Sequence, residues 1–192
     1  MEDIKELGRD LAKNMDMILS ENEQLSKKID LNELATLVDY IQQAPRIFLV
    51  ATGRSGFALR GAAMRLMHLG LTVYFIGDTT TPAITKGDLL IAASGSGTTA
   101  AIVRDGEKSV SLGAKVFAIT TALESPLAKM ANAKVIVPAQ GKQDFDGGKS
   151  QQYAGSLFEQ FLFLMMDAVF QSLWKLEGTQ AEELWARHAN LE

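Results

Sequence analysis

The sequence contains no cysteine among its 192 residues. Disulfide bonds, thiolate-bound zinc sites and cysteine nucleophiles are therefore excluded. A chain without thiols suits the reducing cytosol, and we expect a cytoplasmic protein. Histidine is also scarce, and two isolated histidines provide no spacing that is typical of a metal site. The sequence thus offers no recognisable metal centre.

An excess of positive charge is also absent, because 19 Lys and Arg residues stand against 23 Asp and Glu residues, a net charge of −4. Nucleic-acid binders usually carry a basic surface, so we expect no nucleic-acid partner. A small anionic ligand is still compatible with this charge, since local geometry can hold it. Apolar residues make up 47% of the chain, which is typical of a globular protein. The length fits one domain, which we place over residues 1–192.

The chain lacks a long uncharged hydrophobic run. Its most apolar stretch, Ser156–Leu173, contains Glu159 and Asp167. This stretch spans about 18 residues, whereas a membrane-spanning helix needs about 20 mostly uncharged ones. The charged first residues, Met1–Glu6, do not resemble a signal peptide either. We therefore expect no membrane partner and interpret the apolar stretch as a buried helix.

Residues 1–44 predict two helices before the main body of the domain. Apolar side chains recur at helical spacing over Ile4–Ile18. Asp30 followed by Glu33 resembles a capping box that opens the second helix, and Pro45 ends it. We expect these helices to pack against the domain or against a partner subunit.

Residues 45–175 alternate short apolar runs with helical segments, and residues 176–192 add a short helix and a tail. Most of the runs are continuously apolar, which is typical of strands covered on both faces. This alternation favours a parallel sheet with right-handed crossovers. The predicted fold is a flavodoxin-like α/β protein, a three-layer α-β-α sandwich with a five-stranded parallel sheet. Strands are expected at Ile47–Ala51, Leu71–Ile76, Leu89–Ala93, Lys115–Thr120 and Lys134–Pro138, and helices at 55–69, 98–112, 125–132, 152–174 and 179–190.

Two loops rich in serine and glycine follow the first and third predicted strands, and each opens a helix. In open parallel sheets, ligands bind beyond the carboxyl ends of the strands. A helix N-terminus there offers unpaired N–H groups, glycine allows close approach, and hydroxyls add donors, so the loops predict a phosphate site. Simple turns and N-caps are the alternative, because Ser and Thr favour such positions anyway. The candidate binding residues are Gly53, Arg54, Ser55, Ser94, Gly95, Ser96, Gly97, Thr98 and Thr99.

The same residues indicate which class of phosphate-bearing ligand the loops would bind. Gly95–Ala100 fits the dinucleotide pattern G-x-G-x-x-G/A, but the acid expected at the end of the next strand is missing, and Glu124 lies beyond that strand. No Gly-Lys-Ser/Thr motif for a nucleoside triphosphate is present. A compact phosphate monoester, such as a sugar phosphate, is therefore favoured.

Glu159 is the candidate acid-base residue, because it lies in a helix that is apolar almost all round. A buried carboxylate must be paired, hydrogen-bonded or functional. Asp167 is about 12 Å farther along the same helix, so only Glu159 is placed to meet a ligand. A purely structural buried Glu is the alternative. His68 is expected to complement a helix C-terminus, and His188 lies in a terminal polar segment that is usually solvated.

Taken together, the two loops resemble the sugar isomerase (SIS) domain superfamily. Within it, the sequence is most similar to the 6-phospho-3-hexuloisomerase family, over essentially the whole chain. The loops specify only the superfamily, and three further blocks carry the closer resemblance. These blocks are Met64-Arg65-Leu66-Met67-His68-Leu69-Gly70, Gly155-Ser156-Leu157-Phe158-Glu159-Gln160 and Arg187-His188-Ala189-Asn190-Leu191-Glu192. One departure from the family pattern, at Ser150–Ala154, concerns the wall of the substrate site.

The resemblance implies an isomerase that interconverts D-arabino-hex-3-ulose 6-phosphate and fructose 6-phosphate in formaldehyde fixation by the ribulose monophosphate route. It implies Glu159 as the proton-transferring base, and His188, donated by a neighbouring subunit, as the candidate for work on the sugar ring. It further implies no metal or cofactor, a homotetramer or dimer with sites near subunit interfaces, and a functional link to 3-hexulose-6-phosphate synthase. The implied phosphate ligands are Ser55, Ser94, Ser96 and Thr99.

Two other functions stay open at this point. Another SIS isomerase, such as the sedoheptulose 7-phosphate type, has a similar length, although the terminal block and the place of Glu159 argue against it. A sugar-phosphate sensor without enzymatic activity is the second alternative. Residues 1–44 carry no basic recognition face for DNA, and a sensor would not need Glu159.

Overall fold

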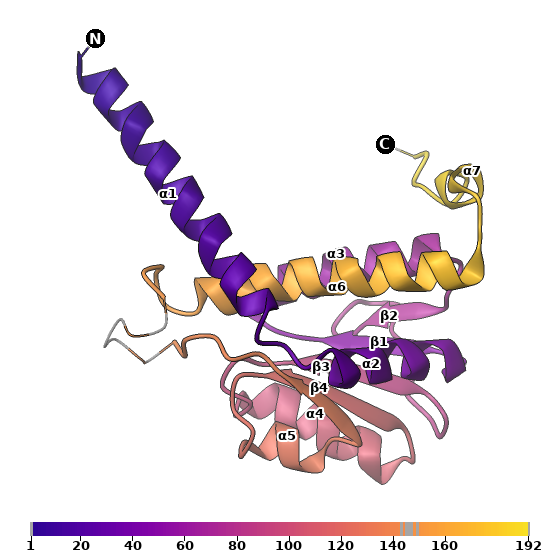
Figure 1. The fold of residues 1–192 in the computed structure, drawn as a ribbon. Coiled ribbons are helices and arrows are strands. Elements are labelled where there is room, and N and C mark those ends of the chain that lie inside the picture. Colours follow the sequence, from indigo (N-terminus) through magenta and orange to yellow (C-terminus); the bar gives the residue numbers. More distant parts are fainter. Residues whose placement is uncertain (1, 143, 145–147, 149, 192) are drawn as a thin grey trace.

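The fold is a five-stranded parallel sheet with helices on both faces, as predicted (Figure 1). The computed structural model describes residues 2–142, 144, 148 and 150–191. The strand order is β2-β1-β3-β4-β5, so the chain reverses its direction of travel across the sheet between β1 and β3. A ligand site is expected beyond the carboxyl ends of β1 and β3 at such a switch point. The strands are β1 (Ile47–Val50), β2 (Val73–Phe75), β3 (Leu89–Ala93), β4 (Lys115–Thr120) and β5 (Ala133–Ile136).

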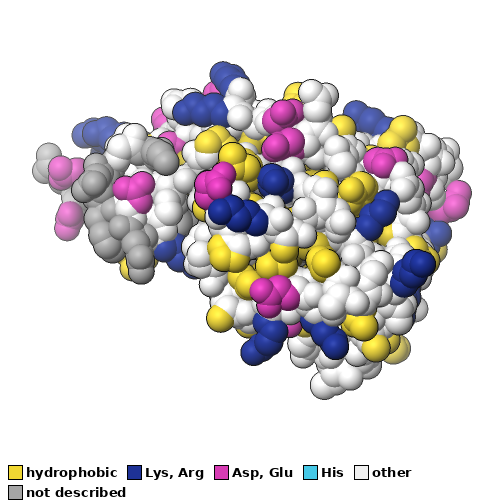
Figure 2. Space-filling model, turned by 90° about the horizontal axis from the view of Figure 1, so that it is seen from below, with side chains coloured by type: hydrophobic (Ala, Val, Ile, Leu, Met, Phe, Trp, Pro, Cys, Tyr) yellow, Lys and Arg dark blue, Asp and Glu magenta, His cyan; other side chains and the backbone are white. Residues whose placement is uncertain are grey.

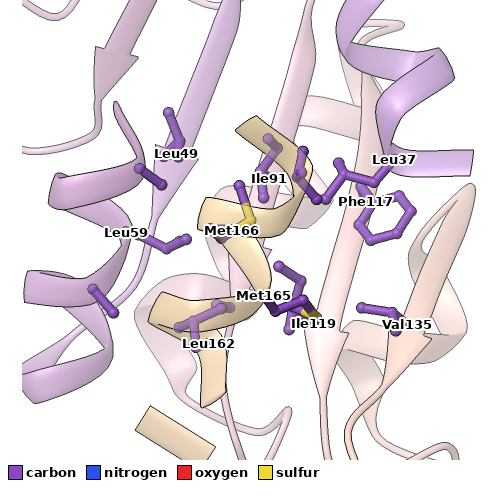
Figure 3. Close-up of a cluster of buried hydrophobic side chains, with 14 of the residues drawn as sticks. Leu37, Leu49, Leu59, Ile91, Phe117, Ile119, Val135, Leu162, Met165 and Met166 are labelled. Atoms are coloured by element: carbon purple, nitrogen blue, oxygen red, sulfur yellow. The ribbon is translucent and has the colours of Figure 1, made fainter. Parts of the chain in front are cut away.

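Each face of the sheet has its own apolar cluster, because successive side chains of a strand point to opposite sides. On one face, alternate strand residues pack against α2 (Leu31–Gln43), α3 (Gly53–His68) and α6 (Ser156–Glu177). Figure 3 shows this cluster, with Met165 and Met166 of α6 against side chains of the strands. On the other face, the remaining strand residues pack against α4 (Ala100–Ser111) and α5 (Pro126–Met130). Burial on both faces explains why the strands are apolar without alternation.

Helix α6 begins at Ser156, four residues later than predicted. Gly155 precedes it in the left-handed conformation, with a φ of +80°, and a helix cannot run through such a residue. Helix α3 begins at Gly53, two residues earlier than predicted, so Gly53–Gly56 forms its first turn rather than a loop before it. These two boundaries matter because both helix starts contribute to the candidate site.

The two N-terminal helices behave differently. In α2, Leu37 and Ile41 are fully buried, and Asp30 caps the helix by accepting hydrogen bonds from the N–H groups of Asn32 and Glu33. A capping box would also have Glu33 accept the N–H of Asp30, and this part of the prediction is wrong. The Glu33 carboxylate instead accepts a hydrogen bond from the N–H of Ile136 in β5 (3.1 Å). That N–H belongs to an edge strand, where Glu33 supplies the acceptor that a further strand would otherwise supply.

Helix α1 (Glu2–Ser26) packs on α6 only through its C-terminal part and projects from the rest of the molecule (Figure 1). Its predicted apolar stripe is therefore exposed rather than packed against the domain. The exposed members are Ile4, Leu7, Leu11 and Met15. A short helix, α7 (Ala181–Trp185), lies at the opposite end of α6, and the predicted helix 179–190 is reduced to it. Within the described residues, none of the helices is both long and apolar enough to cross a membrane.

Candidate active site

The segment Ser94–Thr99, between β3 and α4, is held in one shape by bonds to the neighbouring strand. Thr120 and Thr121 both donate their hydroxyl hydrogens to the carbonyl of Gly95, at 3.0 and 2.9 Å. The carbonyl of Gly97 accepts the N–H of Leu127 at 3.1 Å. These carbonyls therefore face the sheet and α5. Ser96 and Thr98 are exposed, whereas Ser94 is buried. We call this segment the hydroxyl loop.

The hydroxyl groups of the hydroxyl loop form hydrogen bonds with one another and with N–H groups of the same loop. Ser94 Oγ lies 2.9 Å from Thr99 Oγ1 and accepts the N–H of Gly97 at 3.2 Å. Ser96 Oγ accepts both the N–H and the hydroxyl of Thr98, at 3.3 and 3.0 Å. Thr99 is the N-cap residue of α4 but makes no capping hydrogen bond with its side chain. The alternative that these hydroxyls only cap a helix or close a turn is therefore wrong for Thr99. Ser94 and Ser96, in contrast, do stabilise the turn.

A cavity of about 670 Å³ opens beside the hydroxyl loop. Of the predicted phosphate residues, this cavity is lined by Ser55, Ser94, Gly95, Ser96, Thr98 and Thr99. The first turns of α3 and the segment before α4 thus meet at one space, as the sheet topology requires. Gly53, Arg54 and Gly97 are not part of the lining. Gly97 is a buried residue within the hydroxyl loop, and Arg54 contacts Glu159 instead.

Glu159 lies in the first turn of α6 with its side chain only 6% exposed, between two cations. Arg54 Nη1 is 3.1 Å from Glu159 Oε2 and also donates to Ser156 Oγ at 3.1 Å. Lys142 Nζ is 3.4 Å from Glu159 Oε1. A buried carboxylate needs such partners, because an unpaired buried charge is costly. Glu159 does not line the cavity itself, but its partner Lys142 does, so one ion pair connects the carboxylate with that space.

Sequence reasoning missed Lys142 and a polar network behind Glu159. Glu21 of α1 accepts hydrogen bonds from the N–H of Gln151 (2.6 Å), from Ser150 Oγ (2.7 Å) and from Gln152 Nε2 (2.9 Å). Burial alone would raise the pKa of Glu21, but these hydrogen bonds lower the pKa below its ordinary value. Gln160, next to Glu159, donates to Gln152 Oε1 at 2.7 Å. The departure at Ser150–Ala154 therefore contributes a structural brace between α1 and α6, and none of its residues lines the cavity.

The two histidines lie together, far from the hydroxyl loop. His68 ends α3 and is 2% exposed, and its ring stacks on His188 with the ring centroids 3.9 Å apart. Arg187 donates to the carbonyl of His68 at 2.9 Å and so holds the terminal segment on α3. Burial lowers the pKa of His68, and the neighbouring His188 and Arg65 lower it further. His68 lies 13 positions after Ser55 on α3, about 20 Å along the helix axis, so His188 does not reach the cavity of its own chain.

The surface charge agrees with the expectation of a small ligand. Basic and acidic side chains are interspersed over the face shown in Figure 2, which carries no extended patch of one sign. Among the described residues, no group of three or more His, Asp or Glu side chains is arranged to hold a metal ion.

Comparison with known proteins places the chain in a family. Residues 40–163 match the family model described as "SIS domain". A "3-hexulose-6-phosphate isomerase" of Mycobacterium gastri is 52% identical over 98% of this chain and 95% of its own length, and one of Bacillus subtilis is 38% identical over 91% and 95%. A crystal structure from Methanococcus jannaschii, described as inferring "a molecular function of 3-hexulose-6-phosphate isomerase", has a TM-score of 0.80 at 30% identity, over 94% of this chain and 99% of that one. The chain belongs to the SIS domain family.

Proposed function

We propose that this protein is a 3-hexulose-6-phosphate isomerase, which interconverts D-arabino-hex-3-ulose 6-phosphate and fructose 6-phosphate. The observation that carries the proposal is a buried, doubly paired carboxylate, Glu159, beside a cavity lined by hydroxyls at two helix N-termini. The similarity to relatives that bear this name supports the same substrate pair. The test is a coupled assay that supplies the hexulose phosphate and detects fructose 6-phosphate, with and without a chelator. Absence of turnover in both conditions would refute the proposal.

In the proposed reaction the carbonyl moves from C3 to C2. Glu159 takes the proton from C2, and the electron pair of the broken C–H bond forms the C2–C3 double bond while the C3 carbonyl becomes an oxyanion. The O2 proton then passes to O3, the C2 carbonyl forms, and C3 takes back the proton that Glu159 holds. One carboxylate can serve both carbons because they are adjacent, and the bound phosphate orients them against it.

The hydroxyl loop is the proposed phosphate site, and removing its serine hydroxyls tests this role. The double variant Ser94→Ala plus Ser96→Ala deletes two side chains that line the cavity. Hydrogen bonds to a charged group contribute about 1.5–3 kcal/mol each, so the loss of two is expected to raise KM about 100-fold or more, with a smaller effect on kcat. Initial-rate kinetics measure both constants.

The matched control for this experiment is Ser111→Ala plus Ser172→Ala. These two hydroxyls donate only to helix carbonyls, those of Lys108 and Ala168, and do not line the cavity. The control should keep the wild-type KM. An unchanged KM in the Ser94/Ser96 variant would contradict the phosphate role of the hydroxyl loop.

We further propose that the active form is a homo-oligomer, a tetramer or a dimer, in which His188 serves the cavity of another subunit. Its position about 20 Å from the cavity of its own chain supports a role in trans. Large apolar side chains on the outer faces of α3 and α6 support an interface beside Glu159, since Phe57 is 75% exposed and Phe163 is 45% exposed. These two phenylalanines also flank a smaller cavity that includes Glu159 and Arg54.

Ring chemistry predicts when His188 matters. Fructose 6-phosphate closes a ring through O5, whereas the 3-ulose with a phosphorylated O6 has no hydroxyl suited to an ordinary ring. His188→Gln is therefore expected to lower kcat/KM for fructose 6-phosphate about 100-fold, the lower end of the range for a general acid-base group. The 5-deoxy analogue of fructose 6-phosphate cannot form that ring, so its turnover should be nearly unaffected. Equal losses for both substrates would remove the ring-opening role.

Mixing subunits of two impaired variants tests whether His188 acts in trans. Glu159→Gln and His188→Gln subunits, unfolded and refolded together, should regain activity, because some sites would combine an intact Glu159 with an intact His188 from another chain. Each variant refolded alone is the control. Failure of the mixture, with hybrid oligomers demonstrated by differently tagged subunits, would place His188 outside the active site.

A further inference from the structure

Lys142 is a charged residue at the cavity, and the reaction described above gives it no role. Its side chain lines the same space as the hydroxyl loop and reaches Glu159 Oε1 at 3.4 Å. It therefore touches both halves of the site, the part proposed for the phosphate and the carboxylate proposed as the base. Asp144 is the other charged residue of the lining, so Lys142 supplies the positive charge among the described lining residues.

The stem of Lys142 is positioned by the start of α6. A Cβ atom added to Gly155 would lie 2.9 Å from Lys142 Cγ and 3.4 Å from its Cε. Only glycine gives the stem room there, and the positive φ of Gly155 independently favours glycine. The lysine chain thus crosses the N-terminus of α6, and its ammonium group lies over the first turn, which carries Glu159.

The two cations beside Glu159 differ in what they can do. Arg54 binds one carboxylate oxygen and Ser156 Oγ together, so it holds Glu159 in place. Lys142 approaches the other oxygen, and its side chain is 64% exposed, on the cavity side. A flexible stem lets an ammonium group follow a negative charge that moves by a few ångströms, whereas a guanidinium in a fixed two-point contact cannot.

We propose that Lys142 is a further catalytic residue, which stabilises the oxyanion of the enediolate; this inference rests on the proposed isomerase function. When Glu159 takes the C2 proton, the carboxylate becomes neutral and an equal negative charge appears on O3 of the substrate. The ammonium group of Lys142 then exchanges its ion pair with Glu159 for one with this oxyanion. When C3 takes the proton back, the oxyanion is lost and Glu159 is again the partner of Lys142. The total charge of the site is constant throughout, which keeps the barrier low in a partly buried site.

The test compares Lys142→Met with Lys142→Arg. Removal of one oxyanion donor typically lowers kcat by about 100-fold or more, and we expect this of Lys142→Met with KM changed less than about threefold. Lys142→Arg keeps the charge and should recover at least about a tenth of the wild-type kcat. Lys27→Met is the matched control, because it removes an exposed ion pair with Glu23 on α1 (2.6 Å) and should leave both constants unchanged.

Two inhibitors separate the oxyanion role from phosphate binding. The carboxylate of 4-phospho-D-erythronate imitates the charged 2,3-enediolate, because its carboxyl carbon lies as far from the phosphate as C3 of the substrate, whereas D-glucitol 6-phosphate carries the phosphate but no such charge. Lys142→Met should weaken binding of the first at least tenfold and of the second less than threefold. If Lys142→Met weakened the binding of both inhibitors equally, or raised KM with kcat unchanged, Lys142 would be a phosphate ligand and the proposal would be wrong. An unchanged kcat together with an unchanged KM would also contradict it. Inactivity of the wild-type protein would instead refute the isomerase function itself.

Discussion

Glu159→Gln is expected to reduce kcat by about a thousandfold, because a positioned general base contributes about 10²–10⁴ to a rate. The amide is nearly the same size as the carboxylate, and its oxygen can still accept the Arg54 hydrogen bond. The site should therefore keep its shape and lose only the group that accepts the C2 proton. Titration calorimetry with D-glucitol 6-phosphate should give a Kd within about threefold of wild type, since the hydroxyl loop is unchanged.

A control on the same helix distinguishes a catalytic loss from a structural one. Asp167 lies eight residues after Glu159 on α6, about 12 Å farther along, and borders a separate cavity with Arg65 and His68. Asp167→Asn removes the same charge from the same helix and should not reduce kcat of the assembled enzyme by more than a few-fold. Wild-type activity in Glu159→Gln would eliminate Glu159 as the base, and loss of inhibitor binding would indicate that the carboxylate supports the fold of the site.

The second large effect is expected from Gly97→Ala, which changes the hydroxyl loop without removing a polar group. Gly97 has a φ of +63°, and an added Cβ would overlap the side chain of Ser125 and lie 3.0 Å from Thr120 Oγ1. The left-handed conformation costs about 1–2 kcal/mol with a side chain, and overpacking costs about 1–3 kcal/mol. The free energy of unfolding should therefore fall by about 2–5 kcal/mol. Urea denaturation followed by circular dichroism measures this change.

The displacement in Gly97→Ala should also damage phosphate binding. Ser125 caps α5 by accepting the N–H of Ala128, and the Gly97 carbonyl accepts the N–H of Leu127. Moving either contact shifts the hydroxyls at the cavity, so KM should rise along with the loss of stability. Gly95→Ala is the matched stability control, because its Cβ would make an ordinary 3.5 Å contact with Phe158 and no positive φ is involved. Equal stabilities of the two variants would show that the loop accommodates a side chain at Gly97.

The strands and the core were readable from the sequence because their signals are local. Continuous apolar runs such as Leu89–Ala93 and Lys115–Thr120 predicted strands with the observed bounds. The burial of α6 was likewise predicted from its composition, since a helix that is apolar all round has no face for water. The errors lie at boundaries such as Gly53 and Gly155, where the local conformation of one glycine decides and the apolar period gives no signal.

The candidate site was only half predictable. The hydroxyl loop follows a strand, so its place at the carboxyl edge of the sheet follows from the topology. Its partner in the first turn of α3 follows for the same reason. The cations at Glu159 come from distant positions, Arg54 in α3 and Lys142 after β5, and no period or motif connects them with α6. Similarly, the stacking of His188 on His68 depends on how the chain returns after α6.

The two N-terminal helices also separate what the sequence predicts from what tertiary packing decides. Both are amphipathic in sequence, yet α2 buries Leu37 and Ile41 against the sheet while the stripe of α1 is exposed in the single chain. The sequence by itself determined the elements, their order, the absence of thiol chemistry and the hydroxyl loop, because these depend on residue types within one or two turns or strands. Only the tertiary structure decided which charges surround Glu159, which cavity Lys142 enters and which apolar faces remain open to a partner. Those contacts join residues far apart in the chain, and the packing of α3 and α6 on one face of the sheet brings them together.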